Sequence, residues 1–113
     1  MTNSEWDALP DIVKTFMTAL DTDEYDRVLG TLATDAVVTD EGHDYTNHDD
    51  IRAWLATAVN EYTYTTEFTG ATNTDAGVDV TQHLEGNFPG GVADLNYRFT
   101  LDGATITRVV IEP

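Results

Sequence analysis

The sequence contains no cysteine and a single serine, Ser4, among its 113 residues. A chain without thiols forms no disulfide, no thiolate nucleophile and no thiolate metal site, so cysteine usage gives no information about the compartment. The sequence also has no G-x-x-x-x-G-K-[ST] loop, no G-x-G-x-x-G turn and no serine in a nucleophile elbow. Serine hydrolysis and nucleotide-dependent phosphoryl transfer therefore fit this sequence poorly.

Basic side chains are scarce. Five lysines and arginines stand against 21 aspartates and glutamates, which gives a formal net charge of −16. This charge repels nucleic acid and anionic membranes at ordinary ionic strength, so we expect neither as a partner. The acids are dispersed along the chain, a pattern typical of halophilic organisms, where salt screens the repulsion between carboxylates. One interpretation is that the acidity reflects habitat rather than function.

Long hydrophobic runs are lacking, and no stretch approaches the length of a membrane span. The first residues, MTNSEWDALPDIVK, have neither the basic segment nor the apolar core of a signal peptide, so we expect a cytoplasmic protein. Apolar residues make up 41% of the chain, enough for a packed core. The length suits one domain, which we expect to span residues 1–113.

The first predicted helix covers residues 4–20, with Ser4 in the position of a cap. Its apolar residues recur at helical spacing: Trp6, Leu9, Ile12, Val13, Phe16, Met17 and Leu20. Pro10 lies inside this pattern, so regular helix begins either at Ser4 with an irregular first turn or near Pro10.

Two further helices are predicted. Residues 25–32 form a shorter amphipathic stripe that Gly30 interrupts. Asn47 is placed to cap a third helix, whose first turn carries two aspartates. The apolar face of that helix would consist of Ile51, Trp54, Leu55, Ala58 and Val59.

The other segments predict strands. Residues 36–40 read as a short strand that Gly42 ends, and four longer runs are rich in threonine, valine and aromatic residues: 62–72, 77–85, 92–101 and 104–112. The segments NFPGG and LDGA supply the residues that turns with positive φ require. The order helix, helix, strand, helix and four strands predicts an α+β fold with an antiparallel sheet.

Alternation in the two central runs predicts which side chains face the core. Val78, Val80 and Leu84 would share one face, with His83 on the other, outer face. In the next run the core face would be Ala93, Leu95, Tyr97, Phe99 and Leu101. Arg98 would lie opposite and pair with neighbouring carboxylates.

This order of elements, together with the segments VKTFMTAL, ATDAVVTDEG, DDIRAWL, GNFPGG and LNYRFTLDGATITRVVIEP, resembles the nuclear transport factor 2-like superfamily, especially its SnoaL-like branch. The resemblance covers almost the whole chain. It implies a cone of three N-terminal helices packed on a strongly curved, mainly antiparallel sheet, commonly with dimers formed through the sheet. Steroid isomerases, polyketide cyclases, dehydratases and epoxide hydrolases share this fold, so the fold does not select an activity.

Asp40 is the leading catalytic candidate. The resemblance places it where ketosteroid isomerases carry their proton-transferring aspartate, and a carboxylate beside an apolar chamber can abstract a proton α to a carbonyl. The resemblance also places Phe16 and Leu95 where those isomerases carry the tyrosine and the acid that stabilise the enolate, which argues against steroid isomerisation. The alternative is a structural Asp40 that accepts hydrogen bonds from amides of the following loop.

Five aromatic residues are candidates for the wall of the chamber: Phe16, Trp54, Tyr64, Tyr97 and Phe99. The two phenols would orient a ligand by hydrogen bonding. The alternative is that these rings form an ordinary core. No cofactor is implied.

Residues 39–50, TDEGHDYTNHDD, concentrate acids and histidines. Nitrogen and oxygen ligands for a divalent metal could come from His43, Asp44, His48 and Asp49, but their spacing matches neither a calcium loop nor a zinc helix. We interpret the segment as a polar connection followed by a helix N-terminus, where acids interact favourably with the helix dipole. We therefore predict no metal site.

Two hypotheses follow. The first is a homodimer whose subunits each bind a small hydrophobic molecule in an apolar chamber, with Asp40 as general base or water-orienting acid and Tyr64 or Tyr97 as donor. The second is a non-catalytic ligand carrier or dimerising domain whose own side chains fill the chamber.

Overall fold

The computed structural model describes residues 4–57 and 62–113. Within these residues the helices are α1 (Ser4–Asp7), α2 (Asp11–Asp21), α3 (Tyr25–Thr31) and α4 (Asn47–Ala56). The strands are β1 (Leu32–Asp40), β2 (His43–Thr46), β3 (Tyr64–Asn73), β4 (Gly77–Gly86), β5 (Val92–Asp102) and β6 (Thr105–Glu112).

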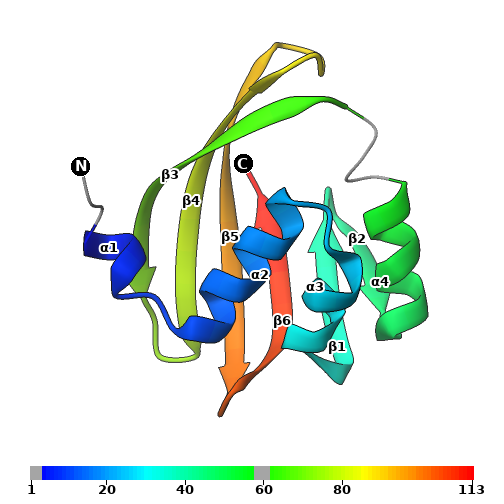
Figure 1. The fold of residues 1–113 in the computed structure, drawn as a ribbon, viewed down its shortest axis with the longest axis vertical. Coiled ribbons are helices and arrows are strands. Elements are labelled where there is room, and N and C mark those ends of the chain that lie inside the picture. Colours follow the sequence, from blue (N-terminus) through cyan, green and yellow to red (C-terminus); the bar gives the residue numbers. More distant parts are fainter. Residues whose placement is uncertain (1–3, 58–61) are drawn as a thin grey trace.

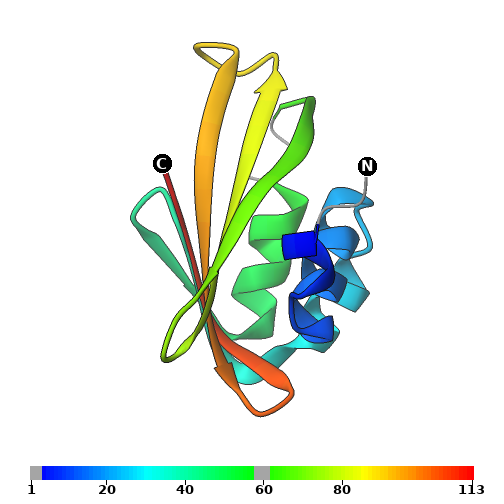
Figure 2. The same ribbon diagram turned by 90° about the vertical axis from the view of Figure 1, so that its left-hand side faces the viewer.

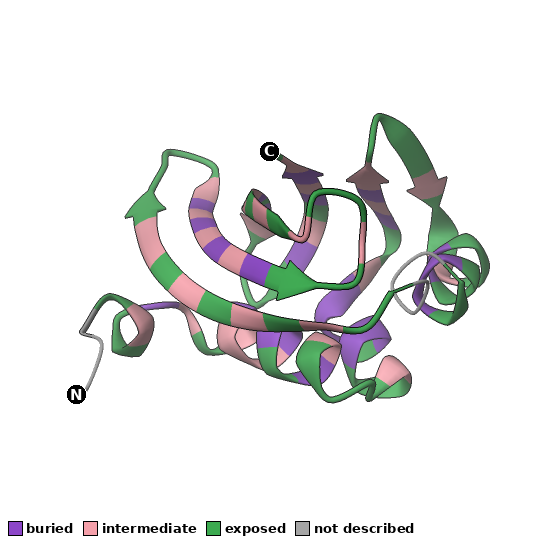
Figure 3. Cartoon of the chain, turned by 90° about the horizontal axis from the view of Figure 1, so that it is seen from above, coloured by how far each residue is buried: buried purple, intermediate pink, exposed green. Residues whose placement is uncertain are grey.

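The six strands form one sheet in the order β2-β1-β6-β5-β4-β3. Neighbouring strands are antiparallel except β1 and β6, which are parallel. The helices cover one face of the sheet, with α2 and α3 in front of it and α4 beside β1 and β2 (Figures 1 and 2). β3 and β4 are strongly curved (Figure 3). The predicted α+β architecture with a curved, mainly antiparallel sheet is confirmed.

Pro10 divides the first predicted helix in two. Its backbone is extended, with φ −54° and ψ 142°, and its carbonyl accepts the first hydrogen bonds of α2, from the amides of Val13 (3.0 Å) and Lys14 (3.1 Å). Regular helix therefore begins at Asp11. Pro10 has no amide hydrogen to donate within a helix, and its restricted backbone suits the extended position just before the first helical residue. The short turn α1 remains separate.

The segment after Asp40 corrects the prediction of a plain polar connection. Glu41 (φ 53°) and Gly42 (φ 75°) form a two-residue turn with two positive φ angles, and His43 pairs with Asp40 across the resulting hairpin. Two-residue turns of this kind match the twist of antiparallel strands. β2 escaped prediction because it is a short edge strand with almost no buried residues, so its sequence shows no hydrophobic alternation.

The predicted core face of the central strands is confirmed. Val78, Val80 and Leu84 are buried, and they alternate along β4 with less buried residues (Figure 3). Tyr97 and Phe99 are buried on the same side of the sheet in β5. On the outer face Arg98 pairs with Glu112 at 3.1 Å, as predicted. The predicted turns also hold, since the glycines of NFPGG and LDGA have positive φ.

Helix α4 begins as predicted at Asn47. The Asn47 side-chain oxygen accepts a hydrogen bond of 3.1 Å from the amide of Asp50, while its own φ is 69°. This contact satisfies one of the free amides of the first turn. Ile51, Trp54 and Leu55 are buried against the sheet, whereas Ala58 and Val59 lie outside the described residues. No helix in residues 4–57 or 62–113 has the length and apolar character needed to cross a membrane.

Candidate active site

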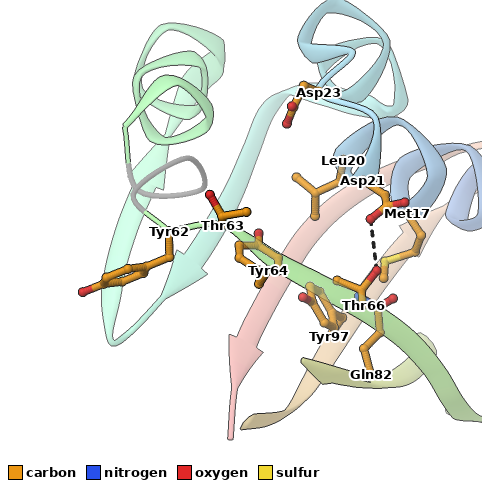
Figure 4. Close-up of a pocket in the computed structure, with 10 residues that line it drawn as sticks. All are labelled: Met17, Leu20, Asp21, Asp23, Tyr62, Thr63, Tyr64, Thr66, Gln82 and Tyr97. Atoms are coloured by element: carbon orange, nitrogen blue, oxygen red, sulfur yellow. Dashed lines mark hydrogen bonds between the residues drawn. The ribbon is translucent and has the colours of Figure 1, made fainter. Parts of the chain in front are cut away.

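The concave face of the sheet is not filled completely by the helices. Two adjoining cavities remain, and both are lined by Leu20, Tyr62, Tyr64 and Tyr97. The cavity on the α2 side has a volume of about 250 Å³ and is also lined by Met17, Asp21, Asp23, Thr63, Thr66 and Gln82 (Figure 4). The cavity on the α4 side has a volume of about 360 Å³ and is also lined by Asp40, Glu41, Trp54, Leu84, Phe88, Pro89, Ala93, Leu95 and Ile111. We call the two together the cup.

Asp40 lies in the wall of the cup, at the last position of β1. Its carboxylate is half-buried, and its Oδ2 atom accepts a hydrogen bond of 3.0 Å from Nε1 of Trp54. Trp54 is itself only 1% exposed and comes from the inner face of α4. The donor to one carboxylate oxygen is thus a rigid, buried indole. Its packing fixes the orientation of Asp40, which a mobile partner would not do.

The phenols of Tyr64 and Tyr97 lie close together on neighbouring parts of the cup (Figure 4). Burial raises the pKa of Tyr97 to about 12, against the weaker opposing effect of a hydrogen bond with Gln82. The pKa of Tyr64 is also raised, first by burial and then by the carboxylates of Asp23 and Asp21. Both phenols therefore keep their protons at neutral pH and can donate hydrogen bonds to a ligand.

Carboxylates form the rim. Three of them are exposed: Asp21 at the end of α2, Asp23 in the connection to α3, and Glu41 in the β1–β2 turn. The Thr66 hydroxyl donates a hydrogen bond of 3.0 Å to Asp21 Oδ1 (Figure 4). None of the five lysine and arginine side chains lines either cavity.

The β4–β5 turn contributes a wall that the sequence analysis missed. Phe88 makes edge contacts with the rings of Tyr62 (6.2 Å between centroids) and Tyr64 (6.4 Å). Asn87 holds this turn against Thr63, since its side-chain oxygen accepts from the Thr63 amide at 2.8 Å and its amide donates to the Thr63 carbonyl at 3.0 Å. The segment NFPGG carried a turn signal, and the apolar Phe88 within it was the only sign of a second role.

The five predicted aromatic residues separate into two groups. Trp54, Tyr64 and Tyr97 line the cup together with Asp40. Phe16 and Phe99 are 0% and 2% exposed, and their rings meet edge to face at 5.2 Å in the hydrophobic core. The structure thus places those two rings behind the wall and not in the lining of either cavity.

The histidines and acids of residues 39–50 make separate contacts with different partners. His48 Nε2 lies 3.1 Å from the Ala33 carbonyl, the ring of His43 lies against Tyr45 at 4.6 Å, and the Thr39 hydroxyl donates to Asp44. In the described part of the chain no group of three or more histidine, aspartate or glutamate side chains is arranged to hold a metal ion.

Comparison with solved structures places this geometry in a known class of small α+β domains. The chain is 32% identical to a proposed polyketide cyclase from Sinorhizobium meliloti, with a TM-score of 0.88 over 95% of this chain and 98% of that one. A hypothetical protein from Catenulispora acidiphila with a ketosteroid isomerase-like fold, in complex with trimethylamine, is 18% identical, with a TM-score of 0.79 over 94% and 87% of the two chains. The delta 5-3-ketosteroid isomerase from Mycobacterium sp. is 14% identical, with a TM-score of 0.73 over 91% and 90%.

Neither a protein-family model nor a curated protein matches the chain. The match to the Sinorhizobium protein spans nearly both chains at an identity that shows common ancestry, whereas the two more distant structures show the fold alone. The chain therefore belongs to the nuclear transport factor 2-like superfamily, in its SnoaL-like branch.

Proposed function

We propose that the cup binds a small, largely apolar molecule and that Asp40 acts on it as a general base. One observation carries this proposal: a carboxylate held by a buried indole lies in the wall of a cavity of about 360 Å³, beside protonated phenols. The likeness to a proposed polyketide cyclase and to ketosteroid isomerases is consistent with ligand binding in this chamber.

The size of the cup sets the scale of the ligand. Cavities of a few hundred cubic ångströms suit molecules of one to three rings. A two-ring molecule that buries about 200 Å² of apolar surface gains about 5 kcal/mol from that burial, and the loss of translational and rotational freedom reduces the net gain, so a minimal probe should bind no more tightly than a Kd of roughly 0.2 mM. Additional polar contacts of a natural ligand would tighten binding beyond this value.

The chemistry that fits this wall is proton abstraction next to a carbonyl group. The Asp40 carboxylate would take the proton from the α carbon, and the electron pair of that C–H bond would move to the carbonyl oxygen to give an enolate. The phenol of Tyr64 or Tyr97 would donate a hydrogen bond to this oxygen, since both phenols are protonated at neutral pH. The phenols would thus replace the donors that steroid isomerases carry at the positions of Phe16 and Leu95.

Deuterium exchange tests this chemistry. β-Tetralone is a neutral two-ring ketone with acidic α protons, and NMR follows its uptake of solvent deuterium directly. We expect the protein to accelerate this uptake and Asp40→Asn to reduce the acceleration at least a hundredfold, because a positioned general base contributes about 10²–10⁴. Asp102→Asn, at the exposed end of β5, is the matched control and should leave the rate unchanged. Equal rates for Asp40→Asn and the unsubstituted chain would refute the role of Asp40.

A non-catalytic carrier is the second candidate, and the Trp54–Asp40 hydrogen bond favours it. This contact gives Asp40 a structural role without any reaction, since it satisfies the buried indole N–H. The same experiment separates the two functions. A carrier would bind β-tetralone without accelerating exchange beyond free solution, whereas the general base would do both.

A further inference from the structure

The charge of the cup has one sign. Four carboxylates reach it from separate segments: Asp21 from α2, Asp23 from the connection to α3, Asp40 from β1 and Glu41 from the following turn. Among the described residues, none of these four forms a salt bridge. The donors to Asp21 and Asp40 are the neutral Thr66 hydroxyl and Trp54 indole, so no basic side chain compensates the negative charges of these two carboxylates.

The basic side chains interact with groups outside the cup. Four of them pair with acids outside the cup, at N–O distances between 2.6 and 3.8 Å: Lys14 with Asp11, Arg27 with Glu24, Arg52 with Asp26, and Arg98 with Glu112. The fifth, Arg108, donates to the Thr39 hydroxyl at 3.4 Å. A ligand anion entering the cup would therefore meet several carboxylates and no lysine or arginine.

Aromatic rings line the cup beside the acids. Tyr62, Tyr64 and Tyr97 line both cavities, and Asp23, Asp21 and Asp40 all lie near enough to Tyr64 to raise the pKa of its phenol further. The electron-rich face of an aromatic ring attracts an organic cation, and carboxylates nearby add to this attraction. The same wall carries apolar side chains, among them Leu84 and Ile111, against which an apolar body can lie.

We propose that the cup selects organic cations, namely molecules with an apolar ring body and a protonated amine. The ring body would lie on the α4 side against Trp54 and Leu84, and the ammonium group on the α2 side between Asp21, Asp23 and the ring of Tyr64. This inference rests on the proposed function, because it assigns a ligand class to the same cup. Acids are common over this whole chain, so their number is not the argument. The argument is their convergence on a concave aromatic wall that has no basic side chain.

Three probes with one ring body and different charges test the selection: β-aminotetralin, β-tetralol and the corresponding tetralin carboxylate. Their Kd values would be measured by calorimetry in one buffer, at the lowest salt concentration at which circular dichroism shows the native fold. We expect the amine to bind about five- to tenfold more tightly than the alcohol. The carboxylate should bind at least about five- to tenfold more weakly than the alcohol.

Charge-removing variants locate the effect. The double substitution Asp21→Asn with Asp23→Asn should weaken binding of the amine about fivefold and leave the alcohol unchanged, whereas Asp102→Asn should change neither. If the amine and the alcohol bind equally well, or the carboxylate binds most tightly, the inference is wrong and the proposed apolar site still stands. If none of the three binds, both proposals are wrong.

Discussion

Trp54 and Asp40 are joined by a hydrogen bond of 3.0 Å from the indole Nε1 to the carboxylate Oδ2. The contact connects the inner face of α4 to the end of β1, and both residues line the same cavity of the cup. A carboxylate alone at this position would turn toward water. The buried indole keeps it beside the cavity, so the same contact supports both the packing of α4 and the proposed chemistry.

Removing the acceptor at Asp40 should destabilise the protein, whereas removing only its charge should not. Asp40→Ala leaves the Trp54 N–H without its partner, which costs about 1–3 kcal/mol. Asp40→Asn keeps an oxygen that can accept the hydrogen bond and should cost less than about 1 kcal/mol. Urea unfolding gives both values, with Asp102→Ala as the exposed control. Equal losses for the two Asp40 variants would show that the hydrogen bond contributes nothing measurable.

Tyr97 should be the last tyrosine to ionise. Burial raises its pKa to about 12 from the ordinary value of 10.0, so an ultraviolet titration should lose its final phenolate step in Tyr97→Phe. A raised pKa means that the folded state holds this proton more tightly than the unfolded state. The stabilisation is therefore complete below pH 10 and disappears as the pH rises toward 12. A Tyr97 that titrates near pH 10 would contradict its burial in the cup.

His83 should titrate above its ordinary pKa of 6.5 because of Asp94. Its Nδ1 lies 2.7 Å from Asp94 Oδ1 on the outer face of the sheet, and this hydrogen bond is the main cause of the raised pKa. The pair stabilises the fold below pH 6.5, and the effect is lost as the pH rises through the raised pKa. NMR titration should show a larger decrease of the His83 pKa in Asp94→Asn than in Glu85→Gln. A larger effect of Glu85→Gln would reverse the assigned order of causes.

Salt should stabilise the protein strongly. A formal charge of −16 repels itself at low ionic strength, and the Debye length falls from about 10 Å at 0.1 M to about 3 Å at 1 M salt. We expect Tm to rise with sodium chloride and the protein to lose structure on dialysis into millimolar salt. If screening is the cause, salts of different anions should act equally at equal ionic strength. A Tm that does not depend on ionic strength would refute the halophilic interpretation of the acidity.

The sequence predicts this fold well where one face of an element is buried. Alternation along β4 and β5 placed Val80 and Tyr97 on the concave face because a period of two is visible in their sequences. The edge strand β2 has no buried face and therefore no such pattern. Its turn depends on the backbone conformation of Glu41 and Gly42, which composition does not reveal.

The site was predictable only in part. Resemblance to a family placed Asp40 at the chamber, but the indole that holds it lies 14 residues away across a hairpin that the sequence did not show. The alternation along β5 predicts that Phe99 and Tyr97 lie on the same side of the sheet. It does not predict that Phe99 packs on Phe16 whereas Tyr97 lines the cup. That distinction requires the curvature of the sheet and the position of α2 on it. Assembly into a homodimer through the sheet remains a prediction.

Binding of β-tetralone, followed at the indole N–H of Trp54 by NMR, tests the central claim most directly. Ala93 lines the cup, so Ala93→Phe should fill it, whereas Val92→Phe adds the same ring at a neighbouring position that is 56% exposed and outside the lining. We predict a saturable shift of the indole signal that Ala93→Phe abolishes and Val92→Phe preserves. An indole signal that does not respond to β-tetralone, or responds equally in both variants, would contradict ligand binding in the cup.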